Sequence, residues 1–430
     1  MGIGHSLSFA EIFFGECLRG LEGVAQYIET FTTFQSSHTH LWIAYLYEGV
    51  SLGRLLYSSS SVAGTGDFVV LKATTYAHSL HANGKLRLLL HNIANAVKNI
   101  HLMNVTHRDI KPENILIRNV TKVTLCDFGS SVNPDMDMGI FYPDGIDTGE
   151  EETVDYKPPE LRLLKRSLQS KEVMILNDYS VNSQYHKETE GLHLSQSYDM
   201  WSLGTLFLEI LLGTPKVFDV NDRIQAIISA HFHGSSREDA ELRDRAVFLA
   251  ALIDFGIVTA SPSIILSLSP DLHSILPTLF HLFDVPFVSL SSTMKTMEQS
   301  STMSTNLMSP ADFTKPSSAL TFPHVHLPDT SQSDNSKDFT RHLSLSYRSV
   351  HKSSIYSFNS HIIASSDSHL QTSSHLRFIQ AYTKRIAVLK EKAIPLSPLL
   401  VDLLLNLLTF SPKERITSVD LCSHQYFLNL

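Results

Sequence analysis

Cysteine and charge are both scarce in this sequence of 430 residues. Its three cysteines lie far apart without a CxxC pair, which argues against a disulfide scaffold or a zinc module and favours a reducing compartment. Charged residues make up 18% of the chain, below the roughly 25% of typical soluble domains. The net charge of −9 excludes a nucleic-acid partner held by bulk electrostatics.

Long apolar runs are also lacking. The most apolar stretch, 264–290, is broken by prolines, aspartates and histidines, whereas a bilayer span needs about 20 mostly apolar residues, so we expect no transmembrane segment. The first residues show no basic segment followed by an apolar one, so no secretory signal is expected. Residues 1–6 fit a myristoylation template, which makes Gly2 a candidate for a weak lipid anchor. We predict a cytoplasmic location and leave a nuclear one open.

What the sequence does contain is enough apolar residues, 43%, for a sizeable core. Apolar periodicity predicts helices over 86–101, 200–212, 222–255 and 399–410, and short strands over 40–46, 115–117 and 122–125. The strand at 40–46 is expected to be buried because nearly all of its residues are apolar or aromatic. A serine-rich tract over 291–376 has little periodicity and predicts a loosely ordered insertion.

Three short motifs follow one another in the middle of the chain. They are HRDIKPEN at His107–Asn114, DFG at Asp127–Gly129 and TVDYKPPE at Thr153–Glu160. In this order, and with a helix and two strands around the first two, the chain resembles a eukaryotic protein kinase. The resemblance implies an α+β, two-lobed kinase-like fold with a truncated small β lobe and a mainly helical large lobe carrying a long insertion.

The resemblance implies phosphoryl transfer from ATP with Mg²⁺, a reaction that needs positioning and charge neutralisation. Asp109 would accept the proton of a substrate hydroxyl, and Lys111 would face the transferred phosphoryl group. Asn114 and Asp127 would bind Mg²⁺, because amide and carboxylate oxygens are hard ligands. Lys111 together with Thr153 implies a serine/threonine kinase with protein substrates.

Further residues receive supporting roles from the resemblance. Leu116 and Cys126 would line the nucleotide pocket, although Cys126 also fits a small apolar core position. Asp199 would bind the backbone of the catalytic loop, and Arg415 would pair with Glu160 and tie the activation segment to the core. The motif residues with structural roles are His107, Phe128 and Gly129.

The activation segment, Asp127–Glu160, is long. By resemblance, Arg108 would bind a phosphate on this segment, and Thr148 is the candidate phosphosite. The acidic run 150–152 offers an alternative, in which carboxylates bind Arg108 without phosphorylation. A solvated acidic turn with no partner is the simplest interpretation of that run.

A complete kinase begins with a Gly-rich loop, a strand with V-A-I-K and a helix with a glutamate. This sequence resembles the pattern only from that helix onward, with Glu11 as the candidate glutamate and Glu16 as the alternative. The stretch Gly64–Lys72 looks like both missing motifs compressed, but it lies after the hinge-like 45–49 and is interpreted as an inserted loop. Without the lysine and the glycines, we expect weaker alignment of ATP.

The expected division of the chain follows from these features. Residues 1–49 would form a partial small lobe and hinge, 50–218 and 391–430 the large lobe, and 219–390 the insertion, helical at first. More narrowly, residues 47–52, 106–114 and 213–218 are similar to the kinase part of plant proteins that join a kinase to a type 2C protein phosphatase.

Three functions remain open from the sequence. The first is a protein serine/threonine kinase that uses ATP and Mg²⁺. The second is a pseudokinase, a binding module that docks partners without turnover. The third is a small-molecule phosphotransferase of the same fold, which the segment Thr153–Glu160 and the helix of Asp199 disfavour.

Overall fold

The computed structural model describes most of the chain outside the serine-rich tract. The described residues are 3–35, 38–61, 69–80, 84–136, 141, 153–164, 195–258, 265–266, 268–286, 367–389 and 396–428. Gly2, Thr148 and the acidic run 150–152 lie outside these ranges, so the structure does not test their predicted roles. Among the helices described, none is long and apolar enough to cross a membrane.

The strands form small antiparallel sheets. β1 (Tyr27–Gln35) pairs with β2 (His38–Tyr45), β6 (Ile115–Asn119) lies between β3 (Val50–Ser51) and β7 (Lys122–Leu125), and β4 (Tyr57–Ser61) pairs with β5 (Val69–Ala73). The predicted strands at 115–117 and 122–125 are confirmed. The prediction of a loop over 64–72 was wrong at its end, since 69–72 pair with β4, in line with the β-propensity of two adjacent valines.

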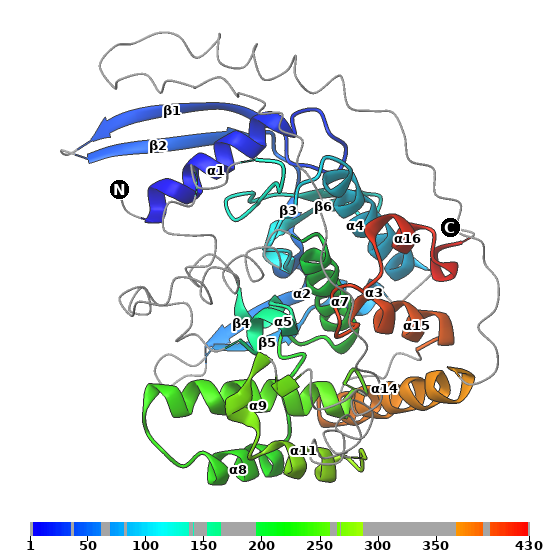
Figure 1. Cartoon of the computed structure of the whole chain (residues 1–430). Coiled ribbons are helices and arrows are strands. Elements are labelled where there is room, and N and C mark those ends of the chain that lie inside the picture. The colour runs from blue at the N-terminus through cyan, green and yellow to red at the C-terminus, as the bar shows by residue number, and fades with distance from the viewer. Residues whose placement is uncertain are drawn as a thin grey trace, which may run out of the picture. The chain divides into compact units, whose positions relative to one another are not determined.

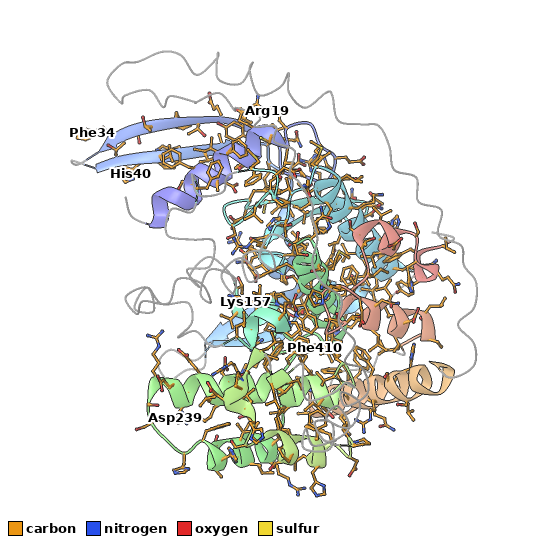
Figure 2. The ribbon with its side chains drawn as sticks, viewed as in Figure 1. Arg19, Phe34, His40, Lys157, Asp239 and Phe410 are labelled. Atoms are coloured by element: carbon orange, nitrogen blue, oxygen red, sulfur yellow. The ribbon has the colours of Figure 1, made fainter. Side chains whose placement is uncertain are left out.

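The β1–β2 hairpin overturns the prediction of a buried strand over 40–46. β2 forms there, but the side chains of Trp42 and Leu46 are 52% and 54% exposed, and Phe34 on β1 is 77% exposed. Phe34 and His40 lie near the outer end of the hairpin (Figure 2). The apolar composition of this run led to the prediction of burial. Composition alone, however, does not tell whether a second layer of structure covers a strand. Among the described residues of the hairpin, only Tyr27 is buried in the core, and the other buried residues of this region precede it in the sequence.

Helices make up most of the remaining structure. The longer ones are α1 (Ile3–Cys17), α4 (Lys85–Leu102), α7 (Ser197–Leu212), α8 (Asp222–His231), α9 (Arg237–Asp254), α11 (Leu276–Leu282), α14 (Asp367–Leu389) and α15 (Pro398–Leu407). Short helices and 3₁₀ turns are α2 (Leu52–Leu56), α3 (Thr75–Leu80), η1 (Pro112–Asn114), η3 (Val154–Tyr156), α5 (Pro159–Arg162), η6 (Pro270–Leu272), α16 (Ser418–Cys422) and η7 (Gln425–Phe427).

Helix α7 is buried along nearly its whole length, as its apolar sequence predicts. It packs against both α4 and α15 (Figure 1). Gly204 allows the close approach of α15, because a Cβ there would lie 2.9 Å from Leu407 and Leu408 side-chain atoms. The helix ends at Gly213 in the left-handed conformation that glycine adopts readily. A rigid central helix therefore supports the loops described below.

Helices on both sides of the serine-rich tract belong to the same core. Phe248 and Phe255 of the α9 region and Phe378 and Tyr382 of α14 are all buried in it, and the rings of Phe255 and Phe378 lie 5.2 Å apart. Ser236 and Asp239 form a capping box that starts α9. The boundaries 1–49, 50–218, 219–390 and 391–430 stay predictions, but described helices within 219–390 pack as part of the helical core.

Candidate active site

One carboxylate binds the backbone of the loop between α4 and β6, residues 105–114, and holds it in place. Asp199, fully buried on α7, accepts hydrogen bonds from the backbone N–H of His107 at 2.7 Å and of Arg108 at 2.9 Å. Its Oδ2 atom also lies 2.9 Å from Nε2 of the buried His101. Arg108 has a φ of 65°, a left-handed conformation that a side chain adopts only when its surroundings hold it.

Replacing Asp199 with asparagine should loosen this loop. An amide has one acceptor oxygen, so its NH₂ group would face one of the backbone N–H donors, and a buried hydrogen bond to a charged group is worth about 1.5–3 kcal/mol. We expect a similar loss in unfolding free energy in urea, with faster amide exchange at His107 and Arg108. Asp222→Asn, at an exposed position of α8, is the control; equal exchange in both variants would disprove this role.

The predicted general base, Asp109, lies at the centre of a connected polar network. Lys111 Nζ donates to Asp109 Oδ2 at 2.7 Å and to Thr153 Oγ1 at 2.9 Å, and Thr153 Oγ1 donates to Asp109 Oδ1 at 2.8 Å. Asn114 Nδ2 donates to the backbone oxygen and to Oδ2 of Asp109, both at 2.9 Å. The structure thus brings three residues from two motifs together around the carboxylate of Asp109.

The residues predicted to bind Mg²⁺ have suitable donor atoms. Both bonds of the Asn114 amide use its nitrogen, which leaves the amide oxygen for a cation. Asp127 follows β7 and has a φ of 68°, and no residue in the described part of the chain donates a hydrogen bond to its carboxylate. No group of three or more histidine, cysteine or acidic residues forms a metal cluster in the described residues. This donor set fits Mg²⁺, which commonly binds through one or two protein oxygens with phosphates and waters.

The DFG and HRD segments are joined through His107. Its Nε2 atom lies 3.1 Å from the carbonyl oxygen of Cys126, and its Nδ1 atom accepts from the Asp109 N–H at 3.3 Å. A carbonyl can only accept, so these partners assign the proton to Nε2. The ring also packs against Phe128, with centroids 4.8 Å apart. Phe128 is completely buried, next to Gly129.

Leu116 and Cys126, the predicted nucleotide contacts, are both partly exposed. Leu116 lies on β6 and pairs with Ser51 and Thr124. Burial raises the pKa of the Cys126 thiol to about 12, and the nearby negative charge of Asp127 acts in the same direction. Cys126 is therefore a thiol at neutral pH and suits a pocket wall better than a nucleophile.

Glu11 on α1, rather than Glu16, faces the DFG segment. Its Oε1 accepts a hydrogen bond from the Tyr45 hydroxyl at the end of β2. Burial raises the pKa of Glu11, the bond from Tyr45 opposes this, and the negative charge of Asp127 raises it further. Glu16 instead pairs with Arg19 at 2.9 Å on the surface. Of the two candidates that the sequence left open, the structure favours Glu11.

Glu160 and Arg415 are 255 positions apart in sequence and form a bidentate pair. Two hydrogen bonds of 3.0 Å join the guanidinium to the carboxylate, and their side chains are 0% and 6% exposed for Arg415 and Glu160. This pair connects α5 to the turn before α16. Arg108 donates from Nη1 to the carbonyl oxygen of Ser130 at 3.3 Å; its predicted phosphate partner lies outside the described residues.

Sequence reasoning missed three polar residues that shape this region: the buried His101 and Glu209 and the partly buried Tyr45. Glu209 on α7 binds the hydroxyls of Tyr57, at 2.8 Å, and Tyr156. A signal existed for two of them, since His101 and Glu209 interrupt otherwise apolar helix faces, where a polar residue requires a partner. Nothing local to Tyr45 indicates its bond to Glu11.

Comparisons with known proteins identify a family and several relatives for this sequence. A model described as protein kinase domain matches residues 23–254. A probable inactive protein kinase of Arabidopsis thaliana is 29% identical over 274 residues, which cover 57% of this chain and 66% of that protein. An Aurora kinase of Schizosaccharomyces pombe is 28% identical over 189 residues, 44% of this chain and 42% of that protein.

A third relative is mitogen-activated protein kinase 12 of Oryza sativa, 33% identical over 132 residues, or 30% of this chain and 17% of that protein. The chain therefore spans 66% or less of the length of each of these relatives. The structure is mixed, with small sheets and a mostly helical remainder. Because the matched domain covers more than half of the chain, this chain belongs to the protein kinase family.

Proposed function

We propose that this chain is a protein serine/threonine kinase, which transfers the γ-phosphoryl group of ATP to serine or threonine hydroxyls of proteins. The observation that carries the proposal is the network around Asp109, in which Lys111, Asn114 and Thr153 each bind its carboxylate or backbone. Asn114 and Thr153 are neutral, so their hydrogen bonds orient the carboxylate of Asp109 without cancelling its charge. A narrower relation to kinase–phosphatase 2C fusion proteins of plants remains part of this proposal.

In the proposed reaction, a substrate hydroxyl attacks the γ-phosphorus, the bond from this phosphorus to the oxygen bridging to the β-phosphate breaks, and ADP leaves. Asp109 accepts the proton that the hydroxyl loses. Lys111, already 2.7 Å from Asp109, offsets negative charge on the transferred group. Asn114 and Asp127 would hold Mg²⁺, which supplies charge neutralisation of the phosphates. Asp199 keeps the 105–114 loop in place, because it binds two successive N–H groups of the backbone.

Binding and turnover can be measured separately. Mg-ATP should raise the melting temperature of the full chain, and Asp127→Asn should remove that shift because a neutral amide replaces the negatively charged metal ligand. Asp109→Asn should keep most of the shift but lower phosphate transfer to a protein substrate by about 10²–10⁴-fold, the usual contribution of general-base catalysis. Transfer that is unchanged in Asp109→Asn would refute the assigned mechanism.

A binding module without turnover is the second candidate. Two observations favour it: the Arabidopsis relative is named a probable inactive protein kinase, and Glu11 binds the Tyr45 hydroxyl with no lysine or arginine partner in the described residues. This candidate predicts no phosphate transfer by the parent chain under conditions where an active kinase control works. Loss of the Mg-ATP shift in the parent chain would favour it further.

A further inference from the structure

A cavity of about 250 Å³ lies beside the end of the activation segment. Its walls come from η3, α5, the turn after α7, and α9. The charged lining residues are Asp155, Arg162, Lys216, Asp219 and Asp244. None of the residues that bind Asp109 lines this cavity, so it is separate from the proposed site of phosphoryl transfer.

The net formal charge of the lining is negative, which favours the binding of a further cation. Three aspartates face two basic residues, a formal charge of −1. Arg162 is fixed in the wall, because its guanidinium lies 4.1 Å from the ring centre of Phe248 and its side chain is only 12% exposed. It lies 3.8 Å from Asp155, whose side chain is 69% exposed. One buried guanidinium is thus shared by carboxylates that remain open to solvent.

Burial lowers the pKa of Arg162, and the negative charges of Asp244 and Asp155 act in the opposite direction. Both carboxylates therefore contribute to the environment of the same guanidinium, while Asp244 is itself exposed on α9. Both carboxylates line the cavity and are exposed, so they are accessible to the cation of a ligand.

The rest of the lining suits the stem of a long basic side chain. Val217, Phe218 and Val247 form an apolar part of the wall. Arginine and lysine bury their methylene groups along apolar surface while the charged head binds polar groups. The exposed lining is more polar than apolar, and its three carboxylates favour the charged head of one such side chain over an anionic group.

The position of the cavity relates it to the substrate. Asp155 is two residues after Thr153, whose hydroxyl donates to the carboxylate of Asp109. Two residues of extended chain span at most about 7 Å, since each residue advances about 3.3–3.6 Å. A peptide whose hydroxyl reaches Asp109 could therefore place a neighbouring side chain in the cavity.

We propose that this cavity binds an arginine or lysine side chain of the protein substrate, within about four residues of the phosphorylated hydroxyl. The inference rests on the proposed function for the presence of a peptide at Asp109. The proposal implies that the substrate segment is basic. It also assigns Asp155 and Asp244 a role in specificity rather than in catalysis.

Peptide binding to the full chain, measured by fluorescence anisotropy without nucleotide, tests the proposal. A central serine is kept, and arginine, neutral citrulline or glutamate is placed in turn at each of the four positions on either side. At one or two positions the arginine peptide should bind about five-fold tighter than the citrulline peptide, as expected for a partly exposed ion pair. Asp244→Asn and Asp155→Asn should each remove that preference.

The matched control is Glu238→Gln, which removes an exposed carboxylate from the same helix, α9, outside the cavity lining; it should keep the preference. Equal binding of arginine and citrulline peptides, tighter binding of glutamate peptides, or no peptide binding overturns the proposal. The Mg-ATP shift is measured on the same preparations. If the shift is absent while the arginine preference and its loss in Asp244→Asn remain, the proposed kinase activity fails, and the cavity binds a basic side chain of a peptide that is not phosphorylated.

Discussion

Replacing Arg415 with methionine is expected to lower the free energy of unfolding by about 3–5 kcal/mol, because the carboxylate of Glu160 would remain buried without its cation. The guanidinium binds both carboxylate oxygens at 3.0 Å and also donates to the backbone oxygens of Ser197, Thr409 and Phe410. It further lies 5.3 Å from the ring centre of Trp201. Urea denaturation of the full chain measures the loss.

A second variant separates the ion pair from general loss of packing. Arg415→Met combined with Glu160→Gln leaves no unpaired buried charge, so it should be more stable than Arg415→Met alone. Arg237→Met is the control, since Arg237 pairs with Glu241 at 3.2 Å but is 85% exposed, and such pairs contribute about 0.3–0.5 kcal/mol. Similar losses in Arg415→Met and Arg237→Met would contradict the assigned role of the buried pair.

Contacts within one motif could be predicted from the sequence, because a short segment with a defined backbone brings its own side chains together. Asp109, Lys111 and Asn114 are separated by at most five positions and meet in one turn. Helix positions were also predictable, since the 3.6-residue period of α4 and the apolar length of α7 require buried faces.

Contacts between distant segments were predictable only through family resemblance or not at all. The pair Glu160–Arg415 was expected by resemblance, and the structure contains it. The choice between Glu11 and Glu16 depended on the rotation of α1, which has weak amphipathicity and no acidic residue in its first turn to mark its start. Contacts with other elements distinguish them: Glu11 binds the Tyr45 hydroxyl and lies near Asp127, and Glu16 pairs with Arg19 on the surface.

Composition also concealed a helix. The serine-rich tract extends to about residue 376, yet α14 begins at Asp367. Phe378, Ala381, Tyr382 and Ile386 follow an i, i+3, i+4, i+8 pattern and are buried. Arg377 donates to the carbonyl oxygens of Phe283 and Asp284, which fastens the helix to the segment after α11. Periodicity in a short window would have been the better guide here.

Glu209 joins three parts of the structure that no local pattern connects. Its carboxylate binds Tyr57, which begins β4, and Tyr156 of η3, next to the proposed peptide-binding residues. Tyr156 is 7% exposed and Glu209 is 1% exposed. The charge state of this one carboxyl group therefore affects the energy of the folded chain.

Burial raises the pKa of Glu209 from its ordinary value of 4.5 to about 8, although the tyrosine hydroxyls act in the opposite direction. The folded chain therefore holds a proton that the unfolded chain has lost between pH 4.5 and 8. Stability must fall as the pH rises through this range, since the unfolding free energy decreases where the folded state binds more protons. At about 1.4 kcal/mol per pKa unit, the loss is up to about 5 kcal/mol above pH 8.

Glu209→Gln isolates this contribution, because glutamine has a similar shape and cannot ionise. The unfolding free energy of the parent chain, measured in urea at pH 5, 7 and 9, should fall relative to that of Glu209→Gln as the pH rises. The two curves should lie closest at pH 5, which is near the ordinary pKa of 4.5 that the carboxyl has in the unfolded chain, so that little of the stabilisation has been lost there. Glu241→Gln, on the same protein at a partly exposed position, should run parallel to the parent. If the unfolding free energy of Glu209→Gln also changes with pH in parallel with that of the parent chain, the buried carboxyl is ionised in the folded state. The tyrosine hydroxyls, rather than a bound proton, then stabilise it.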